Sequence, residues 1–282
     1  MRILNTHFTR FTTLGLFITT LLALSFTSCS EDDTIAFIPQ LPANGGDNVK
    51  KIVHSGKMMK NYDWTFTYNG PRIVNAAGIS RDPQEDKDRQ HVYTSSLKYG
   101  ENYVGVYNSN GEPVSLTLNN QGYISNMEVG RNKNAYTFLY DDGRMVAWHK
   151  TIYEDNFGHT NTYETSAVIN YDNGNLESII MIGPDKVPVT TKFVSSAMEN
   201  RNGLLPETAT EQMGCLGFEH LYYAGLLGKS TKNMVKSLTV SYANDPKKGY
   251  TLNFEYGTEK NNVTLCNYHT DTDEIASVRY DY

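Results

Sequence analysis

Residues 62–74 read Tyr-Asp-Trp-Thr-Phe-Thr-Tyr-Asn-Gly-Pro-Arg-Ile-Val, and this short stretch decides the fold. Aromatic and polar side chains alternate from Tyr62 to Tyr68, which is the two-residue period of a strand with one buried face. The dipeptide Asn69-Gly70 follows, and it favours a tight hairpin turn. The stretch therefore predicts two antiparallel strands joined by a turn.

The same pattern of a strand, a polar turn closed by glycine and a second strand recurs along the chain. The further turns close on Gly122, Gly143 and Gly174, at unequal spacing, which indicates hairpins rather than a strict repeat. More alternating strands follow at residues 236–242, 250–256, 262–268 and 275–282. We therefore predict an all-β fold, an antiparallel hairpin meander that forms an open or partly closed barrel.

One segment interrupts the strands. Apolar residues at positions 218, 221, 222, 226 and 227 have helical spacing, and Gly228 follows them as a helix terminator. The spacing predicts one short helix near residues 218–228. No linker-like composition occurs after Val49, so residues 49–282 are expected to form a single β-meander domain.

The N-terminus has the pattern of an exported protein. Arg2 and Arg10 precede an apolar run of about a dozen residues, so residues 1–28 are predicted to be a signal peptide. Residues 29–48 hold acids, two prolines and Asn44-Gly45-Gly46-Asp47, which indicates an acidic tether. The apolar run is too short for a bilayer span, which needs roughly 20 residues.

The end of this run, Phe26-Thr27-Ser28-Cys29, resembles the lipobox of bacterial lipoproteins. The resemblance implies cleavage before Cys29 and acyl chains such as palmitate on that residue. Glu31, Asp32 and Asp33 resemble the Bacteroidetes signal that sends lipoproteins to the outer face of the outer membrane. We therefore expect a lipid-anchored outer-membrane protein that faces the cell exterior. The alternatives are an ordinary signal peptide with a stray thiol and a merely solvated acidic linker.

The composition argues against some binding partners and against a barrel embedded in lipid. The formal net charge is -6, so no basic face is expected for nucleic acid. The 20 tyrosines and 22 glycines suit many short strands and tight turns. An integral transmembrane barrel needs a continuous lipid-facing apolar band, and the mean hydropathy of -0.49 argues against one.

The residues offer little catalytic chemistry. No two histidines lie two or four positions apart, so neither a metal site nor a cofactor is expected. Gly228-Lys229-Ser230 lacks the first glycine of a phosphate-binding loop, and no Gly-x-Ser-x-Gly motif is present. We predict that the protein is not an enzyme. Cys215 and Cys266 are the only other cysteines, and in an exported protein they could form a disulfide.

The turns of Tyr-Asp-x-Gly-Arg type and the segment Leu221-Tyr-Tyr-Ala-Gly-Leu-Leu-Gly-Lys-Ser-Thr-Lys-Asn233 resemble an uncharacterised family of Bacteroidetes surface lipoproteins. The resemblance covers residues 49–282 and implies a porin-like, meandering β fold of unassigned function. No catalytic residues carry across.

Binding is the remaining functional class. Tyrosine and tryptophan on a wet sheet face can stack on sugars or anchor a partner protein. The first candidates for such a ligand site are Trp64, Arg144, Trp148 and His149. We expect a non-enzymatic module that binds a glycan or a partner protein. A structural component of the envelope and a surface hydrolase are the alternatives.

Overall fold

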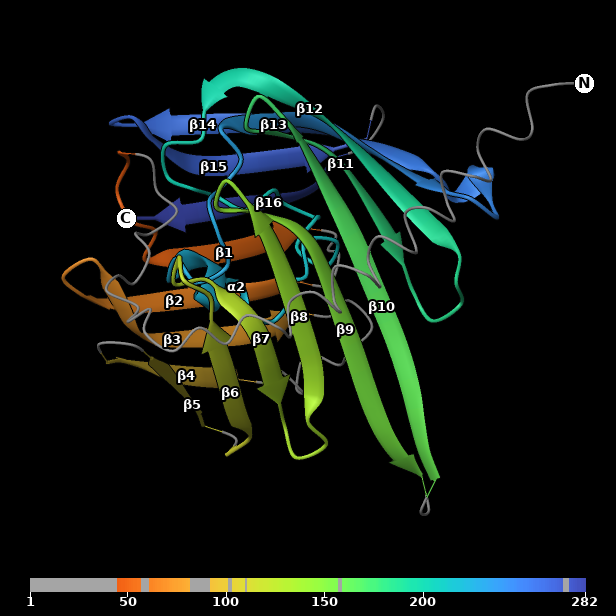
Figure 1. The fold of residues 1–282 in the computed structure, drawn as a ribbon. Helices are drawn as coiled ribbons and strands as arrows, with labels where there is room; N and C mark the ends of the chain where they lie inside the picture. The colour runs from red at the N-terminus through yellow and green to blue at the C-terminus, as the bar shows by residue number, and fades with distance from the viewer. Residues whose placement is uncertain are drawn as a thin grey trace, which may run out of the picture. The chain divides into compact units, whose positions relative to one another are not determined.

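The computed structural model describes residues 45–56, 61–81, 92–100, 103–109, 111–156, 159–270 and 274–282, all within the compact unit Ile35–Tyr282. The predicted signal peptide and residues 29–44 of the predicted tether lie outside the described residues. Within those ranges, sixteen antiparallel strands form one closed barrel (Figure 1).

The strands are β1 (Lys51–Gly56), β2 (Asn61–Asn69), β3 (Arg72–Arg81), β4 (Val92–Tyr99), β5 (Val104–Asn108), β6 (Pro113–Leu118), β7 (Ile124–Val129), β8 (Asn134–Asp141), β9 (Arg144–Asn156), β10 (His159–Asp172), β11 (Asn175–Ile182), β12 (Pro188–Glu199), β13 (Asn233–Tyr242), β14 (Tyr250–Glu259), β15 (Asn262–His269) and β16 (Glu274–Asp281). Each strand pairs with its neighbours in sequence, and β1 pairs with β16 to close the ring. The predicted antiparallel meander is confirmed, and the barrel closes completely.

Two-residue turns join several strands, and the sequence explains them. Asp142-Gly143 links β8 to β9, and Asn173-Gly174 links β10 to β11, with positive φ at all four residues. This is the type I′ geometry that Asn-Gly and Asp-Gly pairs favour in hairpins. Because antiparallel strands alternate in direction, the turns after β2, β6, β8, β10 and β14 lie at one end of the barrel, here called the turn end. The opposite end is called the loop end.

The two faces of the barrel wall differ in polarity. Along β2, Trp64 and Phe66 are buried inside, whereas Thr65 and Thr67 are exposed outside. Most exposed outward positions of the other strands are likewise polar, for example Asn75, Thr94, Thr117, Asn126, Lys192 and Thr239, with Tyr107 and Val194 as exceptions. The hydrophobic core therefore lies within the barrel, and the outer face is suited to water.

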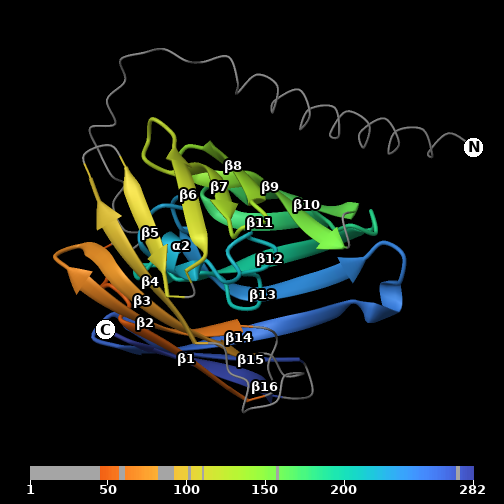
Figure 2. The same ribbon diagram turned by 90° about the horizontal axis from the view of Figure 1, so that it is seen from below.

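A segment between β12 and β13, residues 200–232, fills the inside of the barrel and is called the plug here. It contains the helix α2 (Glu219–Tyr223), which lies within the ring of strands in Figure 2. The described plug residues are mostly buried, and Leu221 and Leu226 are completely so. The predicted helix is present but shorter than expected. It ends at Tyr223, before the predicted terminator Gly228, because Gly225 after the C-cap Ala224 adopts a left-handed conformation.

The plug is fastened to the hairpin turns of the turn end. Three backbone hydrogen bonds recur at every third plug residue, one for each of the turns after β6, β8 and β10. They join Leu226 to Ile124 (2.8 Å), Lys229 to Gly143 (2.7 Å) and Lys232 to Gly174 (2.9 Å). The turns that the sequence repeats therefore hold the plug as well as reversing the chain.

Asn202 fastens the beginning of the plug in the same way. Its side chain donates to the carbonyl oxygen of Asp47 (3.0 Å) and to Asn262 Oδ1 (2.8 Å), and it accepts from the Val263 backbone nitrogen (3.0 Å). Both ends of the plug are thus bonded at the turn end. Within the described ranges, no helix is long and apolar enough to cross a membrane.

A substitution at Gly228 tests the contact between the plug and the turn after β8. Its φ is +90°, and an added Cβ would lie 2.9 Å from the Gly143 carbonyl oxygen. We expect Gly228→Ala to lower the free energy of unfolding by about 2 kcal/mol or more, because backbone strain adds to a clash with the turn. Urea unfolding followed by tryptophan fluorescence measures the change.

Gly70→Ala is the matched control. Gly70 also has positive φ (+59°), but nothing lies within 4 Å of an added Cβ. Its cost should be limited to about 1–2 kcal/mol of backbone strain. Equal destabilisation by the two variants would contradict the close contact between plug and turn.

Candidate functional site

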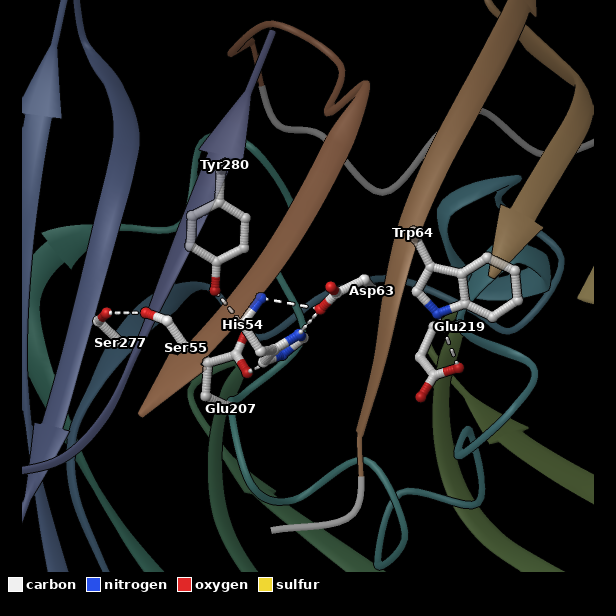
Figure 3. A network of polar contacts seen from close by, with 8 residues as sticks. All are labelled: His54, Ser55, Asp63, Trp64, Glu207, Glu219, Ser277 and Tyr280. Carbon is white, nitrogen blue, oxygen red and sulfur yellow. Dashed lines mark hydrogen bonds and ion pairs between the residues drawn. The ribbon is translucent and has the colours of Figure 1, made fainter. Parts of the chain in front are cut away.

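The plug meets the barrel wall in a buried polar network. It joins His54 of β1, Asp63 of β2 and Tyr280 of β16 to Glu207 of the plug (Figure 3). All four side chains are buried. Burying an unpaired charge is costly, so these side chains must pair with one another. Groups of this kind often have perturbed pKa values and are therefore the first candidates for a functional site.

His54 is held between two carboxylates. Its Nδ1 lies 3.2 Å from Asp63 Oδ1, and its Nε2 lies 3.3 Å from Glu207 Oε2. The His54 backbone nitrogen also donates to Asp63 Oδ1 at 2.9 Å. The second oxygen of Glu207 accepts a hydrogen bond from the Tyr280 hydroxyl. The side chain of Glu207 is thereby fixed to two strands on either side of the barrel seam.

The charges of this network favour a protonated imidazole. Burial alone would lower the pKa of His54, but the hydrogen bonds and negative charges of Asp63 and Glu207 outweigh it and raise the pKa to about 9. At neutral pH His54 is therefore a cation that donates from both ring nitrogens. The network resembles a salt bridge with three members rather than a poised base.

A second contact joins the plug to β2. Trp64 Nε1 donates to Glu219 Oε2 at 3.2 Å (Figure 3). Burial raises the pKa of Glu219 to about 8, although hydrogen bonds from Trp64 and from backbone groups, and the charge of His54, act in the opposite direction. At neutral pH this carboxyl group is predominantly uncharged, which suits its apolar surroundings.

His220 lies beside this contact in the core. Its ring centroid is 4.9 Å from that of Trp64, and burial lowers its pKa to about 3. In the described part of the chain neither of its ring nitrogens has a hydrogen-bond partner. The neutral imidazole therefore acts as an aromatic filler and loses the hydrogen bonds it would make in water.

The geometry is suited to holding the plug rather than to catalysis. Both nitrogens of His54 face carboxylates, so neither is directed at a substrate. The two carboxylates lie on opposite sides of the imidazole, which prevents a shared ion. Among the described residues, no group of three histidine, cysteine or acidic side chains could hold a metal ion.

The two described cysteines are free thiols, not the disulfide that their location allowed. Cys215 is in the plug and Cys266 is in β15, and both are fully buried. Cys215 Sγ lies 3.4 Å from the Met213 carbonyl oxygen. Burial raises the pKa of both thiols well above their ordinary range, so neither forms a thiolate readily.

The expectation of tryptophans on a wet face is wrong. Trp64 is 1% exposed and Trp148 is 5% exposed, and both rings point into the barrel. Trp148 Nε1 donates to the Gln212 carbonyl oxygen of the plug at 2.8 Å. Alternation gives a strand one buried face and one exposed face, and both tryptophan rings occupy the buried face of their strands. Both tryptophans of the chain thus bind the plug.

The other two candidate residues lie apart from the tryptophans. Arg144 is at the turn end, where its Nη1 donates to Asp142 Oδ2 (3.0 Å) and its guanidinium lies 6.0 Å from the Tyr171 ring centre. His149 is half-buried on the outer face of β9, paired in register with Thr137 and Ser166. The structure does not bring the four predicted ligand residues together.

Sequence reasoning missed the carboxylates of the plug. Glu207 and Glu219 lie in a segment that is otherwise rich in apolar residues, and each is buried. An acid within such a segment is a usable signal, because burial of a carboxyl group requires a partner. The partner itself, on a distant strand, cannot be identified from spacing.

The raised pKa values predict how stability depends on pH. Folded His54 keeps its proton up to about pH 9, whereas the unfolded chain loses it near 6.5. The unfolding free energy should therefore fall by about 3 kcal/mol as the pH rises from 6.5 to beyond 9. Glu219 also lowers the unfolding free energy as the pH rises, between its ordinary pKa of 4.5 and its folded pKa of about 8.

Urea unfolding at several pH values separates the two groups. His54→Gln should flatten the curve above pH 6.5, and Glu219→Gln should flatten it between pH 4.5 and 8. Glu219→Gln should also be the less damaging change, because its amide oxygen can still accept from Trp64. Unchanged pH dependence in both variants would contradict these protonation states.

A solved structure from Bacteroides uniformis has a similar fold. A porin-like protein from Bacteroides uniformis superposes with a TM-score of 0.65 at 16% identity, over 87% of this chain and 99% of that one. A porin-like protein from Bacteroides vulgatus is similar at 11% identity and a TM-score of 0.49, over 84% of this chain and 99% of that one. A comparison with curated proteins finds no match.

A family model matches residues 66–265, most of the barrel and the whole of the plug. Its description is a domain of unknown function (DUF4595) with porin-like fold. The sequence resemblance to an uncharacterised family with this fold is thereby confirmed. The chain belongs to the DUF4595 family.

Proposed function

We propose that this protein is a lipid-anchored lipoprotein of the outer membrane, faces the cell exterior, is not an enzyme, and binds a glycan or a partner protein. The anchor is Cys29, and Glu31, Asp32 and Asp33 form the export signal. All four residues lie outside the described part of the chain. Their support is the order of signal peptide, small residues, cysteine and acids along the sequence.

The observation that carries the proposal is the polarity of the barrel wall. A barrel embedded in lipid turns an apolar band outward and often encloses water. Here the described outward positions are rich in threonine, asparagine and serine, and most of the fully buried apolar side chains of the wall face the plug. This pattern favours a barrel that stands in water beside a membrane and is held there by an attached lipid.

The plug supports a binding role over a transport role. Residues 200–232 occupy the interior and are bonded to the wall through Trp64, Trp148, His54 and Tyr280. A ligand must therefore engage the outer face or the rim. Since the buried His54 and both buried thiols are poorly suited to catalysis, binding is the function that the geometry favours.

Lipidation can be tested with an alkyne analogue of palmitate in the native host. We expect Cys29→Ala to abolish labelling and to release the protein from membranes into the soluble fraction, because an outer face rich in polar side chains binds lipid weakly. Cys266→Ala is the control and should keep the label. Retention of unlabelled Cys29→Ala protein in carbonate-washed membranes would contradict the proposal.

Orientation has its own test. Replacement of Glu31, Asp32 and Asp33 by alanine should leave labelling intact but protect the protein from protease added to intact cells. Protection of the wild-type protein from that protease would contradict a location on the cell exterior.

A further inference from the structure

Residues 206–218, in the first half of the plug, are hydrogen-bonded to the strands at only two residues among those that the structure describes. Their backbone hydrogen bonds close within the segment or continue into α2. The two attachment points are the carboxylate of Glu207, which belongs to the buried polar network, and the carbonyl oxygen of Gln212, which accepts from Trp148 (Figure 3 shows the first). Residues 206–218 are called the latched segment here.

The second half of the plug is attached in a different way. Residues 226–232 bond through their backbone to the three hairpin turns of the turn end, and Thr231 Oγ1 also accepts from the Leu176 backbone nitrogen (3.0 Å). These bonds join backbone groups and a hydroxyl, whose charge does not change near neutral pH. The two halves therefore depend on different interactions, and only the attachment of the latched segment depends on charge.

Thr208 is held in an unfavourable conformation within the latched segment. The Ala209 backbone nitrogen donates to the Pro206 carbonyl oxygen (3.2 Å), which closes a turn whose second residue is Glu207 and whose third is Thr208. The φ of Thr208 is +65°, a value that glycine favours and β-branched residues rarely adopt. Its buried Oγ1 makes no hydrogen bond to any described residue. The network thus fixes a turn that is strained and incompletely hydrogen-bonded.

The charge of His54 makes the attachment of Glu207 favourable. His54 loses its proton as the pH rises through about 9, and Asp63 and Glu207 are then two buried carboxylates with no cation between them. Removing one member of a buried ionic group is costly, because the remaining charge is uncompensated. Burial raises the pKa of Glu219 to about 8, so a further buried negative charge appears over the same rise in pH.

The other titratable groups around the network keep their protons over this range. Burial raises the pKa of each well above its ordinary value, and they are Tyr223 of α2, Tyr256 of β14, Cys266 and Tyr268 of β15, and Tyr280 of β16. None of them can replace the lost positive charge, because tyrosine and cysteine are neutral or negative. The attachment therefore weakens as the pH rises.

We propose that the latched segment is a releasable part of the plug, held against the wall by the charge of His54, and that loss of this charge lets residues 206–218 detach while residues 226–232 stay bonded to the turn end. Detachment brings Glu207 into water, lets Thr208 leave its strained conformation and supplies hydrogen bonds to its hydroxyl. This inference concerns a conformational device of the plug and does not depend on the ligand or the membrane anchor proposed above.

Hydrogen exchange followed by mass spectrometry tests the release on the full chain, purified from membranes in a mild detergent. Protection is corrected for the intrinsic exchange rate at each pH. Between about pH 7 and about pH 9.5 we expect the protection of the latched segment to fall at least about tenfold, because His54 and Glu219 both change charge. At the higher pH, residues 226–232 should remain about a hundredfold better protected than the latched segment.

His54→Gln should produce the released state at neutral pH. Cys215 is a buried thiol of the latched segment, and the rate at which iodoacetamide alkylates it, measured on its own peptide, reports detachment. This rate should rise at least about tenfold in His54→Gln. His149→Gln is the matched control, because His149 lies on the outer face of β9, and it should leave the rate unchanged.

Thr208→Gly should act in the opposite direction. Glycine accepts the positive φ without strain, so the alkylation rate of Cys215 should fall severalfold below that of the wild type. A rate equal to or above that of the wild type would show that the turn stores no strain.

Two exchange results would overturn the proposal. In one, the latched segment stays protected at about pH 9.5. In the other, it loses protection together with residues 226–232 and the strands, so that the plug opens only when the barrel unfolds. If His54→Gln fails to fold, the wild-type comparison at the two pH values still decides between release and these outcomes.

Discussion

The width of the barrel is the constraint on which the rest of the structure depends. About eight strands enclose a space that their own side chains can fill, whereas sixteen strands leave an interior too wide for that. In this chain the inward side chains are mostly apolar, so water cannot occupy the space without a large cost. The plug, residues 200–232, fills this space. Its own core residues complete the packing that the wall begins.

Filling a barrel with a single inserted segment creates a second problem, which is the polar backbone and side-chain groups that the segment brings inside. The structure satisfies much of it at two levels. At the turn end, carbonyl groups of hairpin turns accept from the plug at Lys229 and Lys232. Deeper in, wall side chains reach inward, with the indole nitrogens of Trp64 and Trp148 as donors. His220 is an exception, with both ring nitrogens unpaired.

The porin-like description therefore refers to strand connectivity, and the distribution of polarity is different. A membrane porin faces lipid with apolar side chains and faces water inside. Here the exposed residues Thr65 and Thr67 are outside, and Trp64 and Phe66 are inside. The same meander thus encloses an apolar interior that the plug fills.

Local features of the fold could be predicted from sequence, and distant ones could not. The hairpin of β2 and β3 follows from alternation and from Asn69-Gly70, because pairing and turn are both local. Alternation also shows that one face of β2 is buried, but not that the face containing Trp64 encloses a plug. Closure between β1 and β16 and the contact of His54 with Glu207 join residues far apart, for which spacing carries no information.

The place where the chain enters the barrel has a mechanical consequence. Asp47 is bonded to Asn262, and Lys50 to the Asp281 carbonyl oxygen, so the chain enters at the turn end and continues directly into β1. If the protein is tethered through Cys29, a pull on a bound ligand is transmitted along β1. Hydrogen bonds between antiparallel strands run across the strand axis, so this load shears the six paired positions of β1 and β16 together instead of opening them one by one. Under such a tether, the seam between β1 and β16 bears the load in shear.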